Sequence, residues 1–499
     1  MRVHLLFNDK DYEELTRFPK ESETLAADLD LDTIVGAMSD SDDNVEKVCR
    51  TIMFTPLNDE ERINYRKEVL KDVFDNYESV KRLYEITIET EDRRRQSRAI
   101  FPSVYLSSTF SSAIELLKIY VDELMVMRKF TDSVKHAYKS EGFTKLFNAI
   151  HEELPDDYFK KIKAEFDEMS DTDGLLVSAG FGSNLTGTGY MLRKKNYKSQ
   201  WLYWMRTPSY SIEEQDDESQ REIARREELA INDATNALAQ ATDSLKHFFE
   251  VLRDELSFYI GCLNLSDKLK SISMPVCIPT MINNSARSFE GLYNISLAVK
   301  SGQNIVGNDY KENDKKLLII TGANQGGKTV FLQAMGQAQI MAQCGMPVGA
   351  SKFEAPVKQG ILTHFLREED RSMHSGKLDE ELVRMSSIVD KIRPGFLILM
   401  NESFASTNER EGSEICSQIT KAFIDRSIEV MAVTHLYTYA AAFLKDPRAA
   451  FLRAERLNDG SRTFKIVQGE PLSTVYGEDI YKKIFGENEE KDINTDNKQ

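Results

Sequence analysis

The most regular pattern of apolar positions lies in the middle of the chain. Between residues 231 and 259, apolar side chains recur every three or four positions, which is the spacing of one helix face. A helix that began near Glu213 and ended near Gly261 would be roughly 70 Å long at about 1.5 Å per residue. This length is typical of a lever or a coiled-coil arm, although two bundle helices with an unrecognised break would show the same pattern. The first half of the chain is therefore predicted to be mainly α-helical.

A different pattern begins near residue 305, where short apolar runs alternate with helical stretches. The runs at 317–320, 396–400 and 430–433 have the length and composition of buried strands. The stretches predicted to be helices include 330–341, 380–392 and 411–424. Strands that alternate with helices are typical of an α/β domain, in which helices cover both faces of a mostly parallel sheet.

These two patterns divide the chain near residue 305. We expect a mainly α-helical domain at 1–304, followed by an α/β domain at 305–486. Residues 174–190 are rich in Gly, Ser and Thr and contain short apolar stretches, so a small β insertion is expected at about 170–210 within the helical domain. Residues 487–499 are polar and charged, and a segment of this composition is predicted to be disordered.

A glycine-rich motif stands between the first predicted strand and the helix at 330–341. Residues 322–329 fit the pattern G-x-x-x-x-G-K-[ST] at every fixed position, which makes the α/β domain a P-loop NTPase domain. In this strand–loop–helix frame, backbone N–H groups and the helix N-terminus bind phosphates. Lys328 is expected to reach the β- and γ-phosphates and Thr329 to bind Mg²⁺, so the predicted ligands are ATP and Mg²⁺. The predicted nucleotide-binding residues are Ile305, Gly322, Ala323, Asn324, Gln325, Gly326, Gly327, Lys328, Thr329 and Val330.

The strand at 396–400 runs directly into Asn401 and Glu402, which is the arrangement of a Walker B motif. Its first polar residue usually supplies a charged ligand to the Mg²⁺ shell. Asn401 keeps a carbonyl oxygen but lacks the charge, so we expect weaker Mg²⁺ binding and slow ATP hydrolysis. Glu402 is the candidate general base, and His435, after the strand at 430–433, is a candidate sensor of the γ-phosphate. Polar residues that only cap a strand end would give the same pattern.

The composition indicates in which cellular compartment the protein is expected. The chain has 499 residues, of which 41% are hydrophobic and 29% charged, as in an ordinary soluble protein. Its five scattered cysteines contain no C-x-x-C pair, and no apolar run approaches the ~20 residues that span a bilayer. We therefore expect a cytoplasmic protein without a membrane partner. A net charge of −17 argues against a surface covered with phosphate-binding groups, but a local basic stripe is compatible with it.

One basic–aromatic cluster follows the predicted β insertion and includes both tryptophans of the chain. Its cations could neutralise nucleic-acid phosphates while the aromatic side chains stack on bases. An amphipathic β element that packs its tryptophans on the helices would show the same composition. The candidate DNA-binding residues of this cluster are Arg193, Lys194, Lys195 and Lys198.

The motifs of the α/β domain resemble the ATPase domain of the MutS DNA mismatch-repair family over about residues 300–486. That family has an Asn two residues after the first P-loop glycine and a Gly-Gly-Lys, as Asn324 and residues 326–328 have here. Its Walker B strand is followed at fixed length by an Asp-Gly, where this chain has Glu411 and Gly412, and its closing Thr-His matches residues 434–435. Residues 63–70 resemble the start of the family's helical core domain, which acts as a lever.

The resemblance implies an ATP-hydrolysing clamp in which two protomers enclose two ATP molecules and move levers that hold DNA. Nothing in the sequence resembles the family's mismatch-recognition domain or its C-terminal dimer clasp, and the family's trans-acting segment appears as Gly376-Lys377-Leu378-Asp379, with Ser375 beside it. Two functions remain open. The first is a nucleotide-gated, homodimeric DNA clamp in mismatch repair or related DNA maintenance. The second is a nucleotide-gated protein with low turnover that holds a protein or ribonucleoprotein partner.

Overall fold

The computed structural model describes residues 1–15, 17–97, 106–169, 176–183, 187–193, 216–282, 286–323, 325–367, 376–456 and 462–472. The chain forms two compact units, one of Met1–Tyr12 and Asp72–Leu256 and the other of Glu13–Lys71 and Ser257–Gln499. The two units therefore alternate along the chain and do not meet at one boundary near residue 305. The division into functional domains stays a prediction, and the tail at 487–499 lies outside the described residues.

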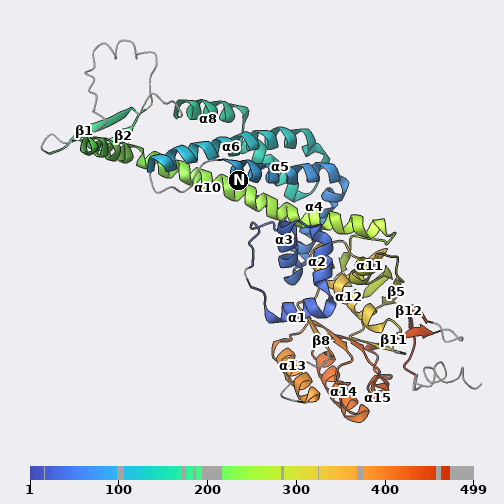
Figure 1. The fold of residues 1–499 in the computed structure, drawn as a ribbon. Coiled ribbons are helices and arrows are strands. Elements are labelled where there is room, and N and C mark those ends of the chain that lie inside the picture. The colour runs from blue at the N-terminus through green and yellow to red at the C-terminus, as the bar shows by residue number, and fades with distance from the viewer. Residues whose placement is uncertain are drawn as a thin grey trace, which may run out of the picture. The chain divides into compact units, whose positions relative to one another are not determined.

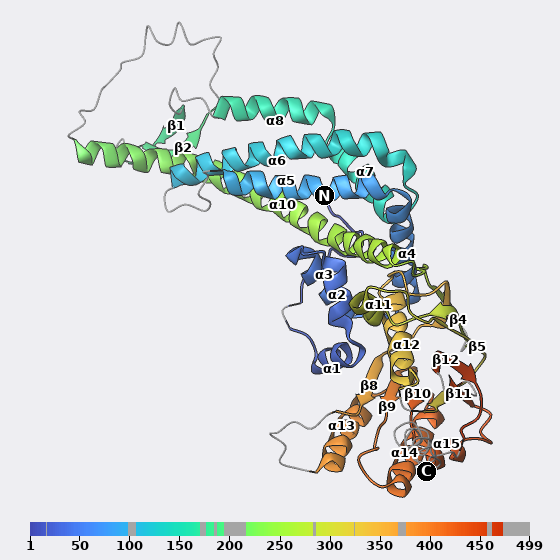
Figure 2. The same cartoon turned by 45° about the vertical axis from the view of Figure 1, so that its right-hand side comes forward.

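The first unit consists mainly of helices. Tyr77–Gln96 (α5) and Leu106–Val134 (α6) lie beside α10, a helix of 55 residues at Asp217–Ser271 (Figures 1 and 2). Tyr120 of α6 stacks on Phe249 of α10, with ring centroids 5.8 Å apart. The prediction of a single long helix is confirmed, and its length is about 80 Å at 1.5 Å per residue. Its action as a lever stays a prediction. Further helices among the described residues of this unit are Lys135–Ala137 (η1), Glu141–Glu153 (α7) and Asp156–Met169 (α8).

A two-stranded antiparallel sheet lies where the β insertion was expected. It pairs Val177–Phe181 (β1) with Gly187–Leu192 (β2). Arg193 follows β2, and its backbone N–H donates to the Leu176 carbonyl at 2.8 Å. The exposed Arg193 side chain donates through Nε to Ser178 Oγ at 2.8 Å. Lys194, Lys195, Lys198 and both tryptophans lie outside the described residues.

The second unit is centred on a six-stranded sheet with the order β12-β11-β6-β10-β9-β8. The five strands from β11 to β8 are parallel, and β12 pairs antiparallel with β11. The three strands predicted from sequence are the adjacent strands β6, β10 and β9, which confirms the mostly parallel sheet. The strands are Leu317–Thr321 (β6), Ile361–Phe365 (β8), Leu397–Asn401 (β9), Glu429–Val433 (β10), Ala449–Arg456 (β11) and Arg462–Gln468 (β12).

Helices cover both faces of this sheet, which explains why its central strands are apolar throughout. Ile398 and Met400 belong to the core that the sheet forms with Lys377–Lys391 (α13), Glu409–Asp425 (α14) and Tyr437–Ala442 (α15). Successive strand residues point to opposite faces, and Leu399 accordingly packs against Lys328–Gln343 (α12). There Gly336 approaches so closely that a Cβ would lie 2.6 Å from Leu399 Cδ1.

A second, four-stranded sheet and the N-terminal helices complete this unit. The sheet has the order β3-β7-β4-β5. Its strands are Thr280–Ile282 (β3), Arg287–Leu292 (β4), Asn308–Glu312 (β5) and Lys352–Pro356 (β7). The helices are Lys20–Leu29 (α1), Leu31–Ser39 (α2), Asp43–Phe54 (α3), most of Glu60–Asp75 (α4), and Ile295–Ser301 (α11). Across the described ranges of the chain, no helix combines the length and apolarity that a membrane span requires.

Candidate active site

The loop between β6 and α12 follows a path that needs glycine at three positions. Gly322 and Gly327 have φ angles of +117° and +87°, in the region that side chains rarely adopt. A Cβ on Gly326 would lie 2.7 Å from Ala454 Cβ and 3.0 Å from the Ala323 carbonyl oxygen. The motif glycines therefore let this loop pass close to β11 while it leads into the first turn of α12.

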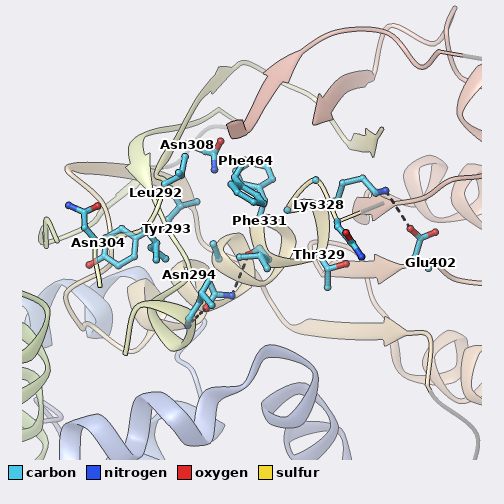
Figure 3. Close-up of a pocket in the computed structure, with 18 residues that line it drawn as sticks. Leu292, Tyr293, Asn294, Asn304, Asn308, Lys328, Thr329, Phe331, Glu402 and Phe464 are labelled. Atoms are coloured by element: carbon cyan, nitrogen blue, oxygen red, sulfur yellow. Dashed lines mark hydrogen bonds and ion pairs between the residues drawn. The ribbon is translucent and has the colours of Figure 1, made fainter. Parts of the chain in front are cut away.

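Lys328 is the first residue of α12, and its ammonium group lies at the loop (Figure 3). Its Nζ donates to the carbonyl oxygens of Gly322 at 2.7 Å and Ala323 at 3.2 Å, and it lies 4.0 Å from Glu402 Oε1. Burial lowers the pKa of Lys328, and the nearby charge of Glu402 partly opposes this shift. An ammonium group has three N–H donors, so the two carbonyls leave one donor and the positive charge for a phosphate.

Thr329 and Asn401 are direct neighbours although they are 72 residues apart in the chain. Thr329 Oγ1 donates to Asn401 Oδ1 at 2.9 Å, which joins the start of α12 to the end of β9. Oxygen ligands of this kind suit Mg²⁺. The structure thus brings together the two residues that the sequence analysis assigned to the metal, and their oxygen atoms fit such an ion.

Glu402 lies directly after β9 in the left-handed region, with φ of 51°. This conformation costs a residue other than glycine on the order of 1–3 kcal/mol. The Glu402 backbone N–H donates to the Val433 carbonyl oxygen at 2.9 Å, which holds the turn beside β10. Glu402 Oε2 accepts the His435 backbone N–H at 3.1 Å and lies 2.6 Å from His435 Nδ1. The two candidate catalytic residues therefore form one hydrogen-bonded pair.

The electrostatic surroundings favour the charged forms of both residues. Burial alone would raise the pKa of Glu402, but the hydrogen bond and charge of His435 and the charge of Lys328 lower it below its usual value. The hydrogen bond to Glu402 raises the pKa of His435. Glu402 is therefore a carboxylate at neutral pH, as a general base must be before it accepts a proton.

A cavity of about 720 Å³ opens beside these groups (Figure 3). Motif residues from Gln325 to Val330 and Glu402 line one part of it, and apolar and aromatic side chains line another. Ile305 and Val330, which the sequence analysis assigned to the nucleotide, both belong to the lining. An apolar compartment beside polar groups is typical of sites that bind a small organic ligand. The apolar lining residues that the sequence analysis missed include Leu292, Tyr293, Leu297, Val306, Phe331 and Phe464.

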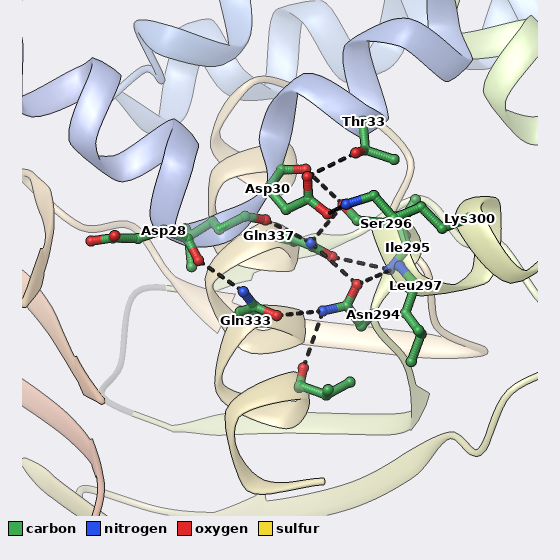
Figure 4. Close-up of polar contacts among 12 residues, drawn as sticks. Asp28, Asp30, Thr33, Asn294, Ile295, Ser296, Leu297, Lys300, Gln333 and Gln337 are labelled. Atoms are coloured by element: carbon green, nitrogen blue, oxygen red, sulfur yellow. Dashed lines mark hydrogen bonds and ion pairs between the residues drawn. The ribbon is translucent and has the colours of Figure 1, made fainter. Parts of the chain in front are cut away.

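Buried amides hold α12 from the side of the N-terminal helices (Figure 4). Asn294, which also lines the cavity, donates through Nδ2 to the Val330 carbonyl at 3.3 Å and to Gln333 Oε1 at 3.2 Å. Gln337 Nε2 donates to the Leu29 carbonyl at the end of α1, at 2.8 Å. These bonds fix the helix that carries Lys328 and Thr329, and no pattern in the sequence marks them.

Some predicted site residues are not part of this arrangement. Asn324 and Ser375 lie outside the described residues, and Gly376 is the residue that precedes α13. Arg193 belongs to the other compact unit. The roles of all these residues, and those of the residues around the cavity, stay predictions.

Two family models match the chain, and one of them covers the site. MutS domain V matches residues 318–482, which include the P-loop, Glu402 and His435, and the MutS2 N-terminal domain matches residues 58–272. The fold and the site thus define a P-loop ATPase domain that follows a largely helical region. The chain belongs to the MutS family. Neither of the two matching models is a mismatch-recognition domain.

Curated relatives support this assignment. The chain is 28% identical over 267 residues to the Endonuclease MutS2 of Anaeromyxobacter sp. (strain Fw109-5), a match that covers 50% of this chain and 32% of the relative. It is 30% identical over 176 residues to the Endonuclease MutS2 of Streptococcus equi subsp. equi (strain 4047), which covers 34% of this chain and 22% of the relative. The matches therefore span no more than about a third of these relatives' length.

Proposed function

We propose that the protein binds and slowly hydrolyses ATP in the cavity beside the P-loop, and that the bound nucleotide controls its binding to DNA. The observation that carries the proposal is the convergence of side chains from three elements beside one cavity, which Lys328, Thr329 and Glu402 line. The first turn of α12 supplies Lys328 and Thr329, the end of β9 supplies Asn401 and Glu402, and the end of β10 leads to His435.

Each side chain has a role that its contacts support. Lys328 provides one free N–H and a positive charge for the phosphates, in a place where burial strengthens electrostatic attraction. Glu402 orients an attacking water and accepts its proton, and the hydrogen bond to His435 holds the carboxylate in place. Thr329 and Asn401 would hold Mg²⁺, which supplies further positive charge to the phosphates.

The DNA part of the proposal rests on family membership and on the basic cluster that contains Arg193. We propose that this cluster contacts DNA phosphates and that α10 transmits the nucleotide state. The active form in this proposal is a cytoplasmic homodimer in which Ser375 and Gly376 face the partner's nucleotide. The relatives are named endonucleases, and the matches cover about a third of their length or less.

The neutral residue Asn401 and the net charge of −17 favour a second candidate function. In it, the protein turns over little ATP and its nucleotide state controls binding to a protein or ribonucleoprotein. Fluorescence anisotropy with duplex and branched DNA, measured with ADP and with ATP at several salt concentrations, separates the two. The DNA clamp predicts nucleotide-dependent affinity, and replacement of Arg193, Lys194, Lys195 and Lys198 by Ala should reduce its salt slope by about two to four units. A slope near zero, or one that the four replacements leave unchanged, would favour the second function.

A further inference from the structure

The loop that follows Glu402 contains a second residue in an unfavourable backbone conformation. Phe404 has a φ of 56°, only two residues after Glu402 with its φ of 51°. Residues other than glycine persist in this region only when their surroundings hold them there. The contacts of the intervening and following residues therefore hold the turn that carries Glu402, in addition to the bonds that Glu402 makes with His435 and Val433.

Glu381 of α13 supplies the first of these contacts. The residue is 2% exposed. Its Oε2 accepts the Phe404 backbone N–H at 2.5 Å, and its Oε1 accepts the Ser406 hydroxyl at 2.5 Å. One buried carboxylate thus binds both sides of the turn, although it lies outside the nucleotide cavity.

His364 of β8 supplies the second contact, at the residue between the two strained positions. His364 Nδ1 lies 2.7 Å from Ser403 Oγ, and Ser403 Oγ lies 2.9 Å from the His364 carbonyl oxygen. The imidazole also stacks on Phe404, with ring centroids 5.4 Å apart, and its Nε2 lies 3.3 Å from the Glu381 carbonyl oxygen. The histidine therefore joins the loop, β8 and α13.

We propose that Glu381 and His364 are positioning residues for Glu402, an inference that rests on the proposed ATPase function. They hold the strained turn, and the turn aims the carboxylate at the cavity. Glu381 lies on the second turn of a helix that begins at Lys377. A displacement of the start of α13 therefore moves the turn and with it the catalytic carboxylate.

The test compares two substitutions of one residue. Glu381→Ala removes both acceptors, whereas Glu381→Gln keeps one oxygen for the Phe404 N–H and an amide that can donate to Ser406. A displacement of about 1 Å in an active site costs on the order of a hundredfold in rate. We expect Glu381→Ala to lower kcat at least tenfold with ATP affinity within about threefold of the wild type, and Glu381→Gln to restore most of kcat.

Two further variants keep the test decisive if Glu381→Ala does not fold. Ser403→Ala removes the hydroxyl that contacts His364 and should lower kcat in the same selective way. Tyr439→Phe is the control, because it removes a buried hydrogen bond to Thr420 Oγ1 of 2.8 Å in the same core. It should change the melting temperature but not kcat.

Unchanged kcat in folded Glu381→Ala and Ser403→Ala proteins would overturn the inference, as would an equal loss in the Tyr439→Phe control. Glu402→Gln is measured in parallel. If the wild type hydrolyses no ATP, or Glu402→Gln is as active as the wild type, the proposed function itself fails, and this outcome is distinct from the failure of the positioning role.

Discussion

Lys328 is the only charged residue of the P-loop motif, and Lys328→Ala removes the charge that we propose binds the phosphates. Two of its three N–H donors bind the carbonyl oxygens of Gly322 and Ala323 at 2.7 and 3.2 Å, so one donor is left for the nucleotide. A hydrogen bond to a charged group contributes about 1.5–3 kcal/mol. About 1.4 kcal/mol corresponds to a factor of ten, so ATP binding should weaken roughly 10- to 150-fold.

Isothermal titration calorimetry with Mg²⁺ and ATP measures this change. Lys300→Ala is a matched control, because Lys300 is an exposed lysine that pairs with Asp30 at 2.5 Å and does not line the cavity. Lys328→Met keeps most of the aliphatic side chain and should bind ATP as weakly as Lys328→Ala, which separates the charge from packing. Equal ATP affinity of the wild type and Lys328→Ala would refute the assignment of the phosphate site.

Three further predictions concern the same site. Asn401→Asp should lower the Mg²⁺ concentration for half-maximal hydrolysis by about tenfold, since a charged oxygen binds Mg²⁺ more strongly than an amide; an unchanged Mg²⁺ titration would contradict this. The pair of Glu402 and His435 should stabilise the fold most between about pH 4.5 and 6.5, and less as pH falls through the lowered pKa of Glu402 or rises through the raised pKa of His435. Scanning calorimetry should thus show a larger decrease in melting temperature for His435→Ala at pH 5.5 than at pH 8.5. The His435 side chain is 51% exposed, so solvent screening makes this decrease small. In light scattering, Glu402→Gln with ATP should have twice the mass of the nucleotide-free protein, and a monomer under all conditions would count against the dimer.

The α/β core was predictable because its signals are local. Strands that are buried on both faces need apolar side chains at every position, and the run at 396–400 shows this without any knowledge of its neighbours. The P-loop signal is equally local, because the glycines that its backbone conformation requires all lie within one motif of eight residues. Even the contact between Thr329 and Asn401 joins two motifs that follow β6 and β9, parallel strands on either side of β10.

The parts that the sequence analysis missed depend on contacts between distant polar residues. Residues 13–71 belong to the same compact unit as the P-loop. The hydrogen bond from Gln337 to the Leu29 carbonyl, within this unit, joins positions 308 residues apart. A buried glutamine on a helix looks like a surface residue in the sequence. Glu381 and His364 were missed for the same reason, because their partners become neighbours only when β8, β9 and α13 pack together.

The most direct measurement compares ATP binding with phosphate release in Glu402→Gln. The substitution keeps the shape of the side chain and removes the base, and a positioned base contributes on the order of 10²–10⁴ in rate. The proposed mechanism predicts ATP affinity within about threefold of the wild type and phosphate release at least about a hundredfold slower. Phosphate release at the wild-type rate would contradict the central claim that Glu402 drives ATP hydrolysis at this site.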